Sequence, residues 1–331
     1  MTLPSPDFYL QEFAQWALNN PGPCPWSVTL DFGLHSGHAV FGSIVHGNET
    51  GSLPAVVAVL EKLKSKSLSY GGKVTFFLGN VEACRRNVRF VESDLNRVFL
   101  DAAPESSETR RARELMPLLR SASVFFDFHQ TIQPTEEPFY IFGFHETSYL
   151  WARAVQGASM MVTRKMGTAF ALNQCCCDEY ARNFDVPAVT LELGQKGITP
   201  EASRLAESAM TRVLTLLDAA QGGSAKLSEL AGRQPDFRFF EIVHREPFQD
   251  PFSGLKPNLR NFTEVKTGEI LGSTEKTPYK APAAGRILFP KYPDRDIQGR
   301  AIGELPSEIF QLAVELEKHP RELWKRDSLE V

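Results

Sequence analysis

The sequence predicts an α/β domain built on a largely parallel or mixed sheet, followed by a smaller and mostly β domain. Short runs rich in Val, Ile and Phe alternate with segments of helical periodicity as far as Ala219. The composition then changes between Gln221 and Pro235, and beyond this stretch helical periodicity largely stops. A length of 331 residues also favours a main domain with a companion over a single core. We therefore expect one domain over residues 1–222 and a second over residues 235–331.

The first elements of the main domain predict a strand, loop and helix unit. Residues 26–45 have the composition of two strands separated by a turn at residues 35–38, and His46 ends the second strand. A turn follows, and residues 52–64 have the period of an amphipathic helix. The apolar side chains of that helix share one face: Leu53, Val56, Val57, Leu60 and Leu63.

The same alternation continues along the chain. We expect further strands at residues 73–78, 123–128 and 188–193. Helical periodicity predicts helices at residues 107–120, 148–156 and 200–219. In the second domain we expect strands at residues 237–244, 269–273 and 285–289, and a terminal helix at residues 306–318.

The composition indicates a folded protein that acts on a small molecule. Hydrophobic residues make up 42% and charged residues 23%, as in globular proteins. A net charge of -4 without a dense block of Lys and Arg argues against a nucleic-acid partner. No apolar run reaches the roughly 18 residues of a membrane span, and the amino terminus lacks a basic start before an apolar stretch. We therefore expect no membrane partner and a cytoplasmic location.

The five cysteines agree with that location, because they predict reduced thiols. Their odd number lacks the spacing of a disulfide framework: Cys24, Cys84, Cys175, Cys176 and Cys177. Three adjacent side chains converge on one ion less easily than a C-x-x-C pair does. We therefore expect buried or loop thiols in the run, and its role stays open.

Metal-capable side chains stand at the ends of apolar strands, where an open α/β sheet collects its ligands. His46 and Glu49 are three residues apart across a strand-to-helix turn, and His129 ends another strand. Two imidazoles and a carboxylate, with a fourth position open for water, make a catalytic zinc site. We expect one Zn²⁺ per chain on these residues, although manganese or cobalt could use the same ligands. In the alternative, the two histidines only cap strand ends.

Glu192 closes another apolar strand and is followed by Gly194. Its carboxylate is either a general base whose pKa is raised by burial or a salt-bridge partner of a neighbouring arginine. The stretch from Gly79 to Arg97 concentrates arginines, Arg89 among them. Arginine binds carboxylates bidentately and can neutralise an oxyanion, so this stretch suits an acidic substrate. A solvated charged loop is the alternative.

Five motifs follow one another along the chain: HGNET at residues 46–50, LGN at 78–80, RF leading to SDLNRVF at 89–99, DFHQT at 127–131 and TLELG at 190–194. With these motifs the chain resembles the succinylglutamate desuccinylase and aspartoacylase family, a branch of the zinc carboxypeptidase fold. RAREL at residues 111–115, and VKTGEILG and APAAGRILFP in the carboxy-terminal part, are also similar, so the resemblance covers nearly the whole chain. It implies a zinc carboxypeptidase-like mixed-sheet domain followed by a smaller β-rich domain.

The resemblance also implies an activity, which is hydrolysis of the amide bond of a small acidic N-acyl amino acid. The implied zinc ligands are His46, Glu49 and His129. Glu192 is implied as the base and later the acid, and Arg89 as the group that polarises the scissile carbonyl. Asn96 and Arg97 are implied to hold the carboxylate of the amino acid.

The sequence departs from the family after the third ligand. Desuccinylases are similar to HTAIRG there, whereas this chain has HQTIQP, with Gln133 at the position of the arginine, and this leaves the acyl group open. Neither Tyr279 nor Tyr292 aligns with the tyrosine that aspartoacylases take from the second domain. Two alternatives remain: a carboxypeptidase-type enzyme acting on a peptide or cell-wall fragment, and a non-enzymatic sensor on a retired hydrolase fold. A β lid that narrows the cleft would favour the deacylase.

Overall fold

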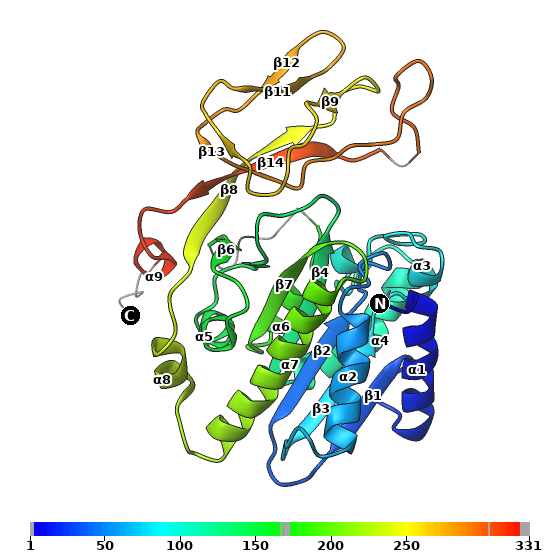
Figure 1. Cartoon of the computed structure of the whole chain (residues 1–331), viewed down its shortest axis with the longest axis vertical. Coiled ribbons are helices and arrows are strands. Elements are labelled where there is room, and N and C mark those ends of the chain that lie inside the picture. The colour runs from blue at the N-terminus through cyan, green and yellow to red at the C-terminus, as the bar shows by residue number, and fades with distance from the viewer. Residues whose placement is uncertain (1–2, 166–167, 169–172, 304, 325–331) are drawn as a thin grey trace.

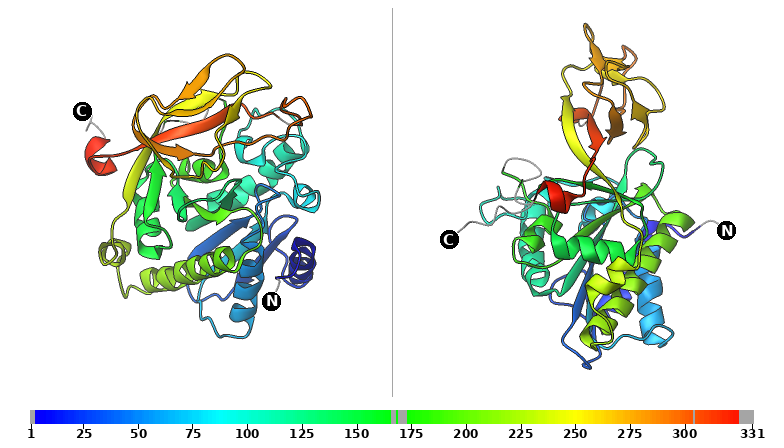
Figure 2. Two further views of the ribbon diagram at one scale, coloured as in Figure 1. Left: turned by 45° about the horizontal axis from the view of Figure 1, so that its top comes forward. Right: turned by 90° about the vertical axis from the view of Figure 1, so that its left-hand side faces the viewer.

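The computed structural model describes residues 3–165, 168, 173–303 and 305–324. Figure 1 shows a body in which helices cover both faces of a sheet, and a lobe of β strands above it. The two further views in Figure 2 show the lobe standing over one end of the body. A long strand, β8 (Arg238–Pro247), runs from the body into the lobe.

The helices of the body are α1 (Pro6–Asn19), α2 (Leu53–Lys64), α3 (Val81–Arg85), the 3₁₀ turn η1 (Leu95–Arg97), α4 (Ser107–Ser121), α5 (Glu146–Val155), α6 (Cys177–Arg182), α7 (Pro200–Gln221) and α8 (Leu227–Gly232). Its strands are β1 (Ser27–Asp31), β2 (His38–Ser43), β3 (Lys73–Leu78), β4 (Val124–Thr131), β5 (Phe139–Ile141), β6 (Met160–Thr163) and β7 (Ala188–Gln195). After β8 come β9 (Gly254–Leu255), β10 (Glu264–Val265), β11 (Ile270–Ser273), β12 (Pro278–Lys280), β13 (Gly285–Leu288), β14 (Glu308–Glu315) and α9 (Pro320–Leu323). Within the described ranges, no helix combines the length and the apolar character needed to cross a membrane.

Eleven of the described strands form one mixed sheet in the order β1-β3-β2-β4-β7-β5-β6-β8-β14-β13-β10. The strands β3, β2, β4 and β7 are parallel, and β5 runs antiparallel to β7. The carboxyl ends of parallel strands meet at one edge of a sheet, where ligands usually bind. The chain that follows β2 and the ends of β4 and β7 therefore come together at that edge.

Side chains of the central strands alternate between the two faces of the sheet. In β4, Phe126 and Phe128 pack into the core that includes residues of α2, α5 and α7. Phe125 packs into a second core, which includes residues of α4 and α6. Asp127 and His129 follow Phe125 at steps of two and therefore share its face. This alternation directs Asp127 and His129 to the α6 side of the sheet.

Most elements predicted for the first domain are confirmed. The bounds of β3 are those predicted, and α2, α4, α5 and α7 differ from prediction by one or two residues at their ends. The strand β4 continues to Thr131, so His129 lies inside the strand rather than after it. Its extension is explained by pairing with β7, in which His129 and Glu192 are partners. The helices α1 and α6 and the short strands β5 and β6 were not predicted.

The predicted terminal helix at residues 306–318 is wrong, because Glu308–Glu315 form the strand β14. This strand pairs antiparallel with β8 and with β13. The run from Ile309 to Ala313 is buried throughout. Glu, Leu, Ala and Gln favour a helix locally, but burial between two strands outweighs such a weak preference.

The division of the chain between residues 222 and 235 stays a prediction. The short helix α8 occupies part of that stretch, and its Ala231 is buried in the core of the body. The strand β8 pairs with β6 on one side and with β14 on the other. One core cluster also joins Phe139 of the body to Phe240 and Phe262 of the carboxy-terminal part. The body and the lobe are therefore packed together through shared strands.

Candidate active site

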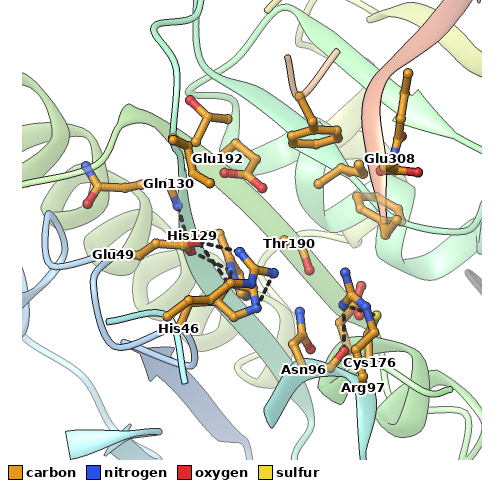
Figure 3. A pocket seen from close by; sticks show the side chains of 18 of the residues that line it. His46, Glu49, Asn96, Arg97, His129, Gln130, Cys176, Thr190, Glu192 and Glu308 are labelled. Atoms are coloured by element: carbon orange, nitrogen blue, oxygen red, sulfur yellow. Dashed lines mark hydrogen bonds and ion pairs between the residues drawn. The ribbon is translucent and has the colours of Figure 1, made fainter. Parts of the chain in front are cut away.

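A cavity of about 450 Å³ lies at the carboxyl edge of the parallel strands, between the body and the lobe. The body contributes the chain after β2, the segment around η1 and the ends of β4 and β7. The lobe contributes four side chains that carry charge or an aromatic ring: Arg245, Phe289, Lys291 and Glu308. In Figure 3, Glu308 lies across this space from the cluster of His46, Glu49 and His129.

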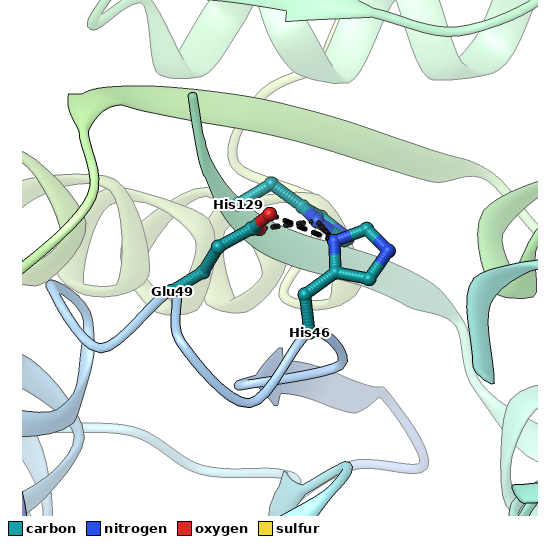
Figure 4. Close-up of side chains that lie close together, drawn as sticks. All are labelled: His46, Glu49 and His129. Atoms are coloured by element: carbon teal, nitrogen blue, oxygen red, sulfur yellow. Dashed lines mark hydrogen bonds and ion pairs between the residues drawn. The ribbon is translucent and has the colours of Figure 1, made fainter. Parts of the chain in front are cut away.

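His46, Glu49 and His129 meet in this cavity, as the sequence predicted (Figure 4). Nδ1 of His46 lies 2.9 Å from Oε1 of Glu49, and Nδ1 of His129 lies 2.9 Å from Oε2 of the same carboxylate. The two Nδ1 atoms are 3.1 Å apart. All three side chains are buried. The turn between β2 and α2 supplies the first two residues, and β4 supplies the third.

These donor atoms fit a zinc-type cation. Two Nδ1 lone pairs that face each other at 3.1 Å repel, unless a proton or a cation lies between them. Two imidazole nitrogens and one carboxylate form the protein part of a catalytic zinc site, with room for water or substrate. Imidazole nitrogens are poorer ligands for Mg²⁺ or Ca²⁺, which take oxygen.

Two further carboxylates orient the imidazole rings. Oδ2 of Asp127 lies 2.6 Å from Nε2 of His129, and Oδ1 of Asp94 lies 3.1 Å from Nε2 of His46. When Nε2 of His129 donates its proton to Asp127, its Nδ1 is left for the cavity, and ligating histidines are commonly fixed in this way. Nε2 of His46 lies near both Asp94 and the guanidinium of Arg89, so these contacts hold its ring without fixing its tautomer. Burial lowers the pKa of His129, but the charges of Asp127 and Glu49 outweigh burial and hold that pKa well above its usual value. The surplus of negative charge favours a cation.

Glu192 in β7 lies beside His129 of β4, since the two are partners in the sheet. Its side chain is buried, and its Oε2 has no hydrogen-bond partner. Burial, together with the charge of Glu49, raises the pKa of Glu192 to about 8. Within the described residues it makes no salt bridge, so the geometry favours the first of the two predicted alternatives. A carboxyl group with this pKa can accept and return a proton near neutral pH.

Arg89 connects two of the metal-capable residues, His46 and Glu49, to Asp94. Its Nε donates to Oδ2 of Asp94 at 3.0 Å, and its Nη1 lies 3.3 Å from Oε1 of Glu49. Its Nη2 lies 2.6 Å from Nε2 of His46. The guanidinium group also lines the cavity, where a fixed positive charge can stabilise negative charge that develops on a bound molecule.

The turn η1 brings Asn96 and Arg97 to the same cavity. Oδ1 of Asn96 accepts a hydrogen bond from the backbone N–H of Cys177 at 2.9 Å. Nη1 of Arg97 donates to the carbonyl oxygen of Asn96 at 2.7 Å and lies 3.4 Å from Sγ of Cys176. The structure therefore gathers every predicted site residue around one space.

A buried carboxylate holds the later part of the arginine-rich segment, whereas residues 85–88 are exposed, as the charged-loop alternative predicted. Glu108, in the first turn of α4, accepts from the backbone N–H groups of Val91 at 2.7 Å and Ser93 at 3.2 Å. It also accepts from Nδ2 of Asn80 at 2.9 Å. Burial raises the pKa of Glu108, but these hydrogen bonds outweigh burial and lower it below its usual value. The ionised carboxylate thus anchors the chain between Arg89 and η1.

Several further residues at the site were not predicted from the sequence. Asp127 could have been found, because an Asp two positions before a His on a strand shares its face. Lys291 and Glu308 carry no local signal, because they reach the cavity only through the placement of the lobe. The cysteine run is buried, as predicted, and Cys176 lines the cavity.

Three residues that the sequence raised as specificity candidates lie elsewhere. Ile132 lines the cavity, whereas the neighbouring Gln133 accepts hydrogen bonds at its backbone carbonyl from Thr131 and Asn261. The hydroxyl of Tyr279 donates to Oγ of Ser253 at 2.8 Å. The hydroxyl of Tyr292 donates to the carbonyl oxygen of Lys256 at 2.8 Å. Both tyrosines therefore have structural partners within the lobe.

Comparison with known proteins agrees with this geometry. A family model described as the succinylglutamate desuccinylase/aspartoacylase catalytic domain matches residues 39–219. The succinylglutamate desuccinylase of Pseudomonas paraeruginosa is 45% identical over 271 residues, which cover 74% of this chain and 77% of that protein. The solved structure of the enzyme so named from Vibrio parahaemolyticus has a TM-score of 0.66 at 16% identity, covering 88% of this chain and 87% of that one. The structure of that from Chromobacterium violaceum has a TM-score of 0.63 at 20% identity, covering 94% and 99%. At these identities the two structures establish the fold, and they confirm the predicted fold class.

Proposed function

This chain belongs to the succinylglutamate desuccinylase/aspartoacylase family of deacylases, and on that premise we propose that it hydrolyses the amide bond of a small acidic N-acyl amino acid with the help of zinc. One observation carries the proposal. His46, Glu49 and His129 converge beside a buried glutamate of raised pKa, in a cavity that the lobe borders. This combination of ligands and base suits hydrolysis of an unactivated carbonyl compound.

The residues present would hold zinc through Nδ1 of His46, Nδ1 of His129 and the carboxylate of Glu49. When bound, zinc would supply Lewis acidity and lower the pKa of water. Glu192 would take a proton from the attacking water and deliver it to the leaving nitrogen, so that an amine rather than an amide anion departs. Binding of a cation to Glu49 would weaken the repulsion that raises the pKa of Glu192, and would bring the base towards its ionised form at neutral pH.

Two other groups would position the substrate and stabilise its transition state. Arg89 lies against the ligand cluster, where its guanidinium would stabilise the oxyanion that forms from the scissile carbonyl. Arg97 and Asn96 would hold the carboxylate of the amino acid, because a guanidinium with an adjacent amide matches two carboxylate oxygens.

The size and charge of the cavity support a small acidic substrate. About 450 Å³ is the size of a small-molecule site, and the lobe borders it on one side, whereas a peptidase needs an open groove. Five lining residues carry a basic side chain, Arg89, Arg97, Arg164, Arg245 and Lys291, against four with a carboxyl group, Glu49, Asp178, Glu192 and Glu308. Of these four, Glu49 would be taken up by the metal and Glu192 would act as the base. The curated relatives are named for succinylglutamate, an N-acyl amino acid. The five free cysteines support a reducing compartment such as the cytoplasm.

A screen of N-acyl amino acids, including N-succinylglutamate and N-acetylaspartate, tests the activity. We expect hydrolysis of at least one by zinc-loaded protein, loss after chelation and recovery when zinc is restored. His46→Ala should lose both stoichiometric zinc and hydrolysis, whereas His244→Ala, at a half-buried histidine of β8 paired with Glu246, should keep both. Hydrolysis of peptides but of none of these substrates would favour the peptidase. Full zinc retention by His46→Ala would contradict the metal site.

A further inference from the structure

The three consecutive cysteines lie against the segment that carries Asn96 and Arg97. The backbone N–H of Cys175 donates to the carbonyl oxygen of Arg97 at 3.1 Å, and Phe99 N–H donates to the carbonyl oxygen of Cys175 at 3.3 Å. The backbone N–H of Cys177 donates to the amide oxygen of Asn96 at 2.9 Å. These bonds fix the backbone of the run, and with it the start of α6, beside the cavity.

The side chain of Cys177 is directed to β4. Its Sγ donates to Oδ2 of Asp127 at 2.9 Å, and this same oxygen lies 2.6 Å from Nε2 of His129. Cys177 and Asp127 are both completely buried. The other carboxylate oxygen, Oδ1 of Asp127, has no hydrogen-bond partner. The described residues therefore offer this buried carboxylate two donors, a thiol and the imidazole of His129.

We propose that the thiol of Cys177 is a positioning residue for the metal centre. It holds Asp127 in the orientation in which that carboxylate binds Nε2 of His129 and keeps Nδ1 of His129 directed at His46 and Glu49. This inference rests on the metal site of the proposed function, and it assigns a role to a residue that touches neither metal nor substrate.

A carboxylate that is removed from water is destabilised unless hydrogen bonds replace its hydration. Burial, together with the charge of Asp127, holds the pKa of Cys177 well above its usual value, so the thiol keeps its proton and remains a donor. Without this donor, Asp127 would retain only the imidazole and would be free to turn towards another partner. Outer-sphere groups that orient a ligating histidine commonly change metal affinity about 10- to 100-fold.

A purely structural role for Cys177 makes a different prediction. Its side chain also belongs to the core with residues of α4 and α6, so removal of the sulfur leaves a small cavity whatever else it does. Packing alone predicts a loss of stability with unchanged zinc affinity. Cys84 provides the matched control, because it is another buried thiol in a core and its Sγ makes no hydrogen bond to the described residues, although its backbone lies near Gly47.

The test is the dissociation constant for zinc, measured by competition with a chromophoric chelator on folded protein at one pH. We expect Cys177→Ala to bind zinc about tenfold more weakly than wild type, at the lower end of outer-sphere effects. Cys177→Ser should recover most of this affinity, because its hydroxyl still donates. Cys84→Ala should bind zinc as wild type does. Thermal unfolding of each variant reports the packing contribution separately.

The outcomes separate this inference from the proposed function. Equal zinc affinity in wild type and Cys177→Ala would overturn the positioning role and leave the metal site intact. A wild-type protein without affinity for zinc would overturn both. If Cys177→Ala does not fold, Cys177→Thr and Cys177→Val replace it, since they share one shape and differ in the hydroxyl donor. Equal affinity in this pair would again overturn the positioning role.

Discussion

Glu49 and Glu192 are two buried glutamates in one cavity whose pKa values shift in opposite directions. Burial by itself acts to raise the pKa of each carboxyl group. At Glu192 the charge of Glu49 acts in the same direction, and the pKa rises to about 8. At Glu49 the charges of His46 and His129 outweigh burial and hold the pKa well below its usual value. The neighbours of each carboxyl group, rather than its residue type, therefore divide the roles of ligand and base between them.

The base is tested by Glu192→Gln, which keeps the size of the side chain but cannot exchange a proton. We expect kcat for the best N-acyl amino acid to fall about 10²- to 10⁴-fold, the usual contribution of a general base. Zinc content should stay at the wild-type level, because the ligands are untouched. Steady-state kinetics together with metal analysis check both points. A zinc-loaded variant with near wild-type kcat would remove Glu192 from the mechanism.

His38, the first residue of β2, leads to a prediction about how the stability of the protein depends on pH. Burial lowers the pKa of His38 to about 4, and its Nε2 lies 2.9 Å from Oγ1 of Thr75. Because the pKa is lower in the folded chain than in the unfolded one, the stabilising contribution of the neutral imidazole is complete above about pH 6.5. It is lost as the pH falls towards 4, and the loss is on the order of 2–3 kcal/mol.

Urea unfolding of wild type and His38→Gln between pH 7 and 4 measures this contribution. The glutamine keeps a polar group near Thr75 but does not titrate. All other groups titrate alike in the two proteins, so their contributions cancel when the two free energies of unfolding are compared. We expect wild type to lose more free energy of unfolding than the variant over this range. Parallel curves for the two proteins would show that His38 does not titrate as described.

Among the elements, the first turn of α4 and the loop at residues 91–93 are held together by hydrogen bonds. The first turn of α4 places Glu108 under the backbone of residues 91–93, and this backbone leads to η1 with Asn96 and Arg97. A single carboxylate thereby connects helix packing to the geometry of the cavity. Loops that carry functional residues are commonly positioned in this way by a rigid scaffold.

Glu108→Gln tests this connection, because the new amide group would face backbone donors that the carboxylate now accepts. We expect the free energy of unfolding to fall by about 2–4 kcal/mol, from lost charged hydrogen bonds and unpaired N–H groups. The KM should rise more than kcat falls, since Asn96 and Arg97 are proposed to bind substrate rather than to transfer protons. Exposed Glu105→Gln, just before the same helix, should leave both quantities near wild type. If Glu108→Gln is destabilised but its KM is unchanged, the loop that Glu108 holds does not control substrate binding.

At the scale of the whole molecule, the cavity is complete only because the lobe covers the edge of the sheet. Lys291 follows β13 and reaches the cavity from the lobe, with its backbone N–H bonded to the carbonyl oxygen of Ile309 in β14. In the described part of the chain its amine makes no hydrogen bond or ion pair. Burial and the charge of Arg89 lower its pKa to about 8. A desolvated amine of this kind suits an anionic group of the substrate.

We therefore expect Lys291→Met to raise the KM for acyl groups that end in a carboxylate by about tenfold or more, as loss of a charged hydrogen bond does. The KM for an N-acetyl substrate should change little. Since the amine is charged only below its pKa, wild-type affinity for such acyl groups should fall as the pH rises through about 8. Lys256→Met, which removes a lobe lysine paired with Glu269, is the control. Equal changes for both substrate classes would contradict a contact with the acyl end.

The sequence by itself determined the local parts of this protein. Short apolar runs and a period of about 3.6 residues predicted most strands and helices of the body, and the three-residue spacing of His46 and Glu49 predicted a pair of ligands on one turn. The end of an apolar strand indicated Glu192 and the arginine-rich stretch indicated Arg89, and the ordered motifs implied roles for both and for Asn96 and Arg97. These signals act over a few residues, where backbone geometry and side-chain direction are nearly fixed.

The contacts between residues that are far apart in the sequence follow from the tertiary structure alone. Within the predicted helix at residues 306–318, Glu308–Glu315 form a strand because β8 and β13 flank it, against the local helical preference. Lys291 reaches the cavity, and the thiol of Cys177 reaches Asp127, through the pairing of the lobe and the docking of α6. Such contacts depend on how whole helices and strands pack. The free energy of this packing comes from burying surfaces that are remote in sequence, so no short sequence pattern can predict it.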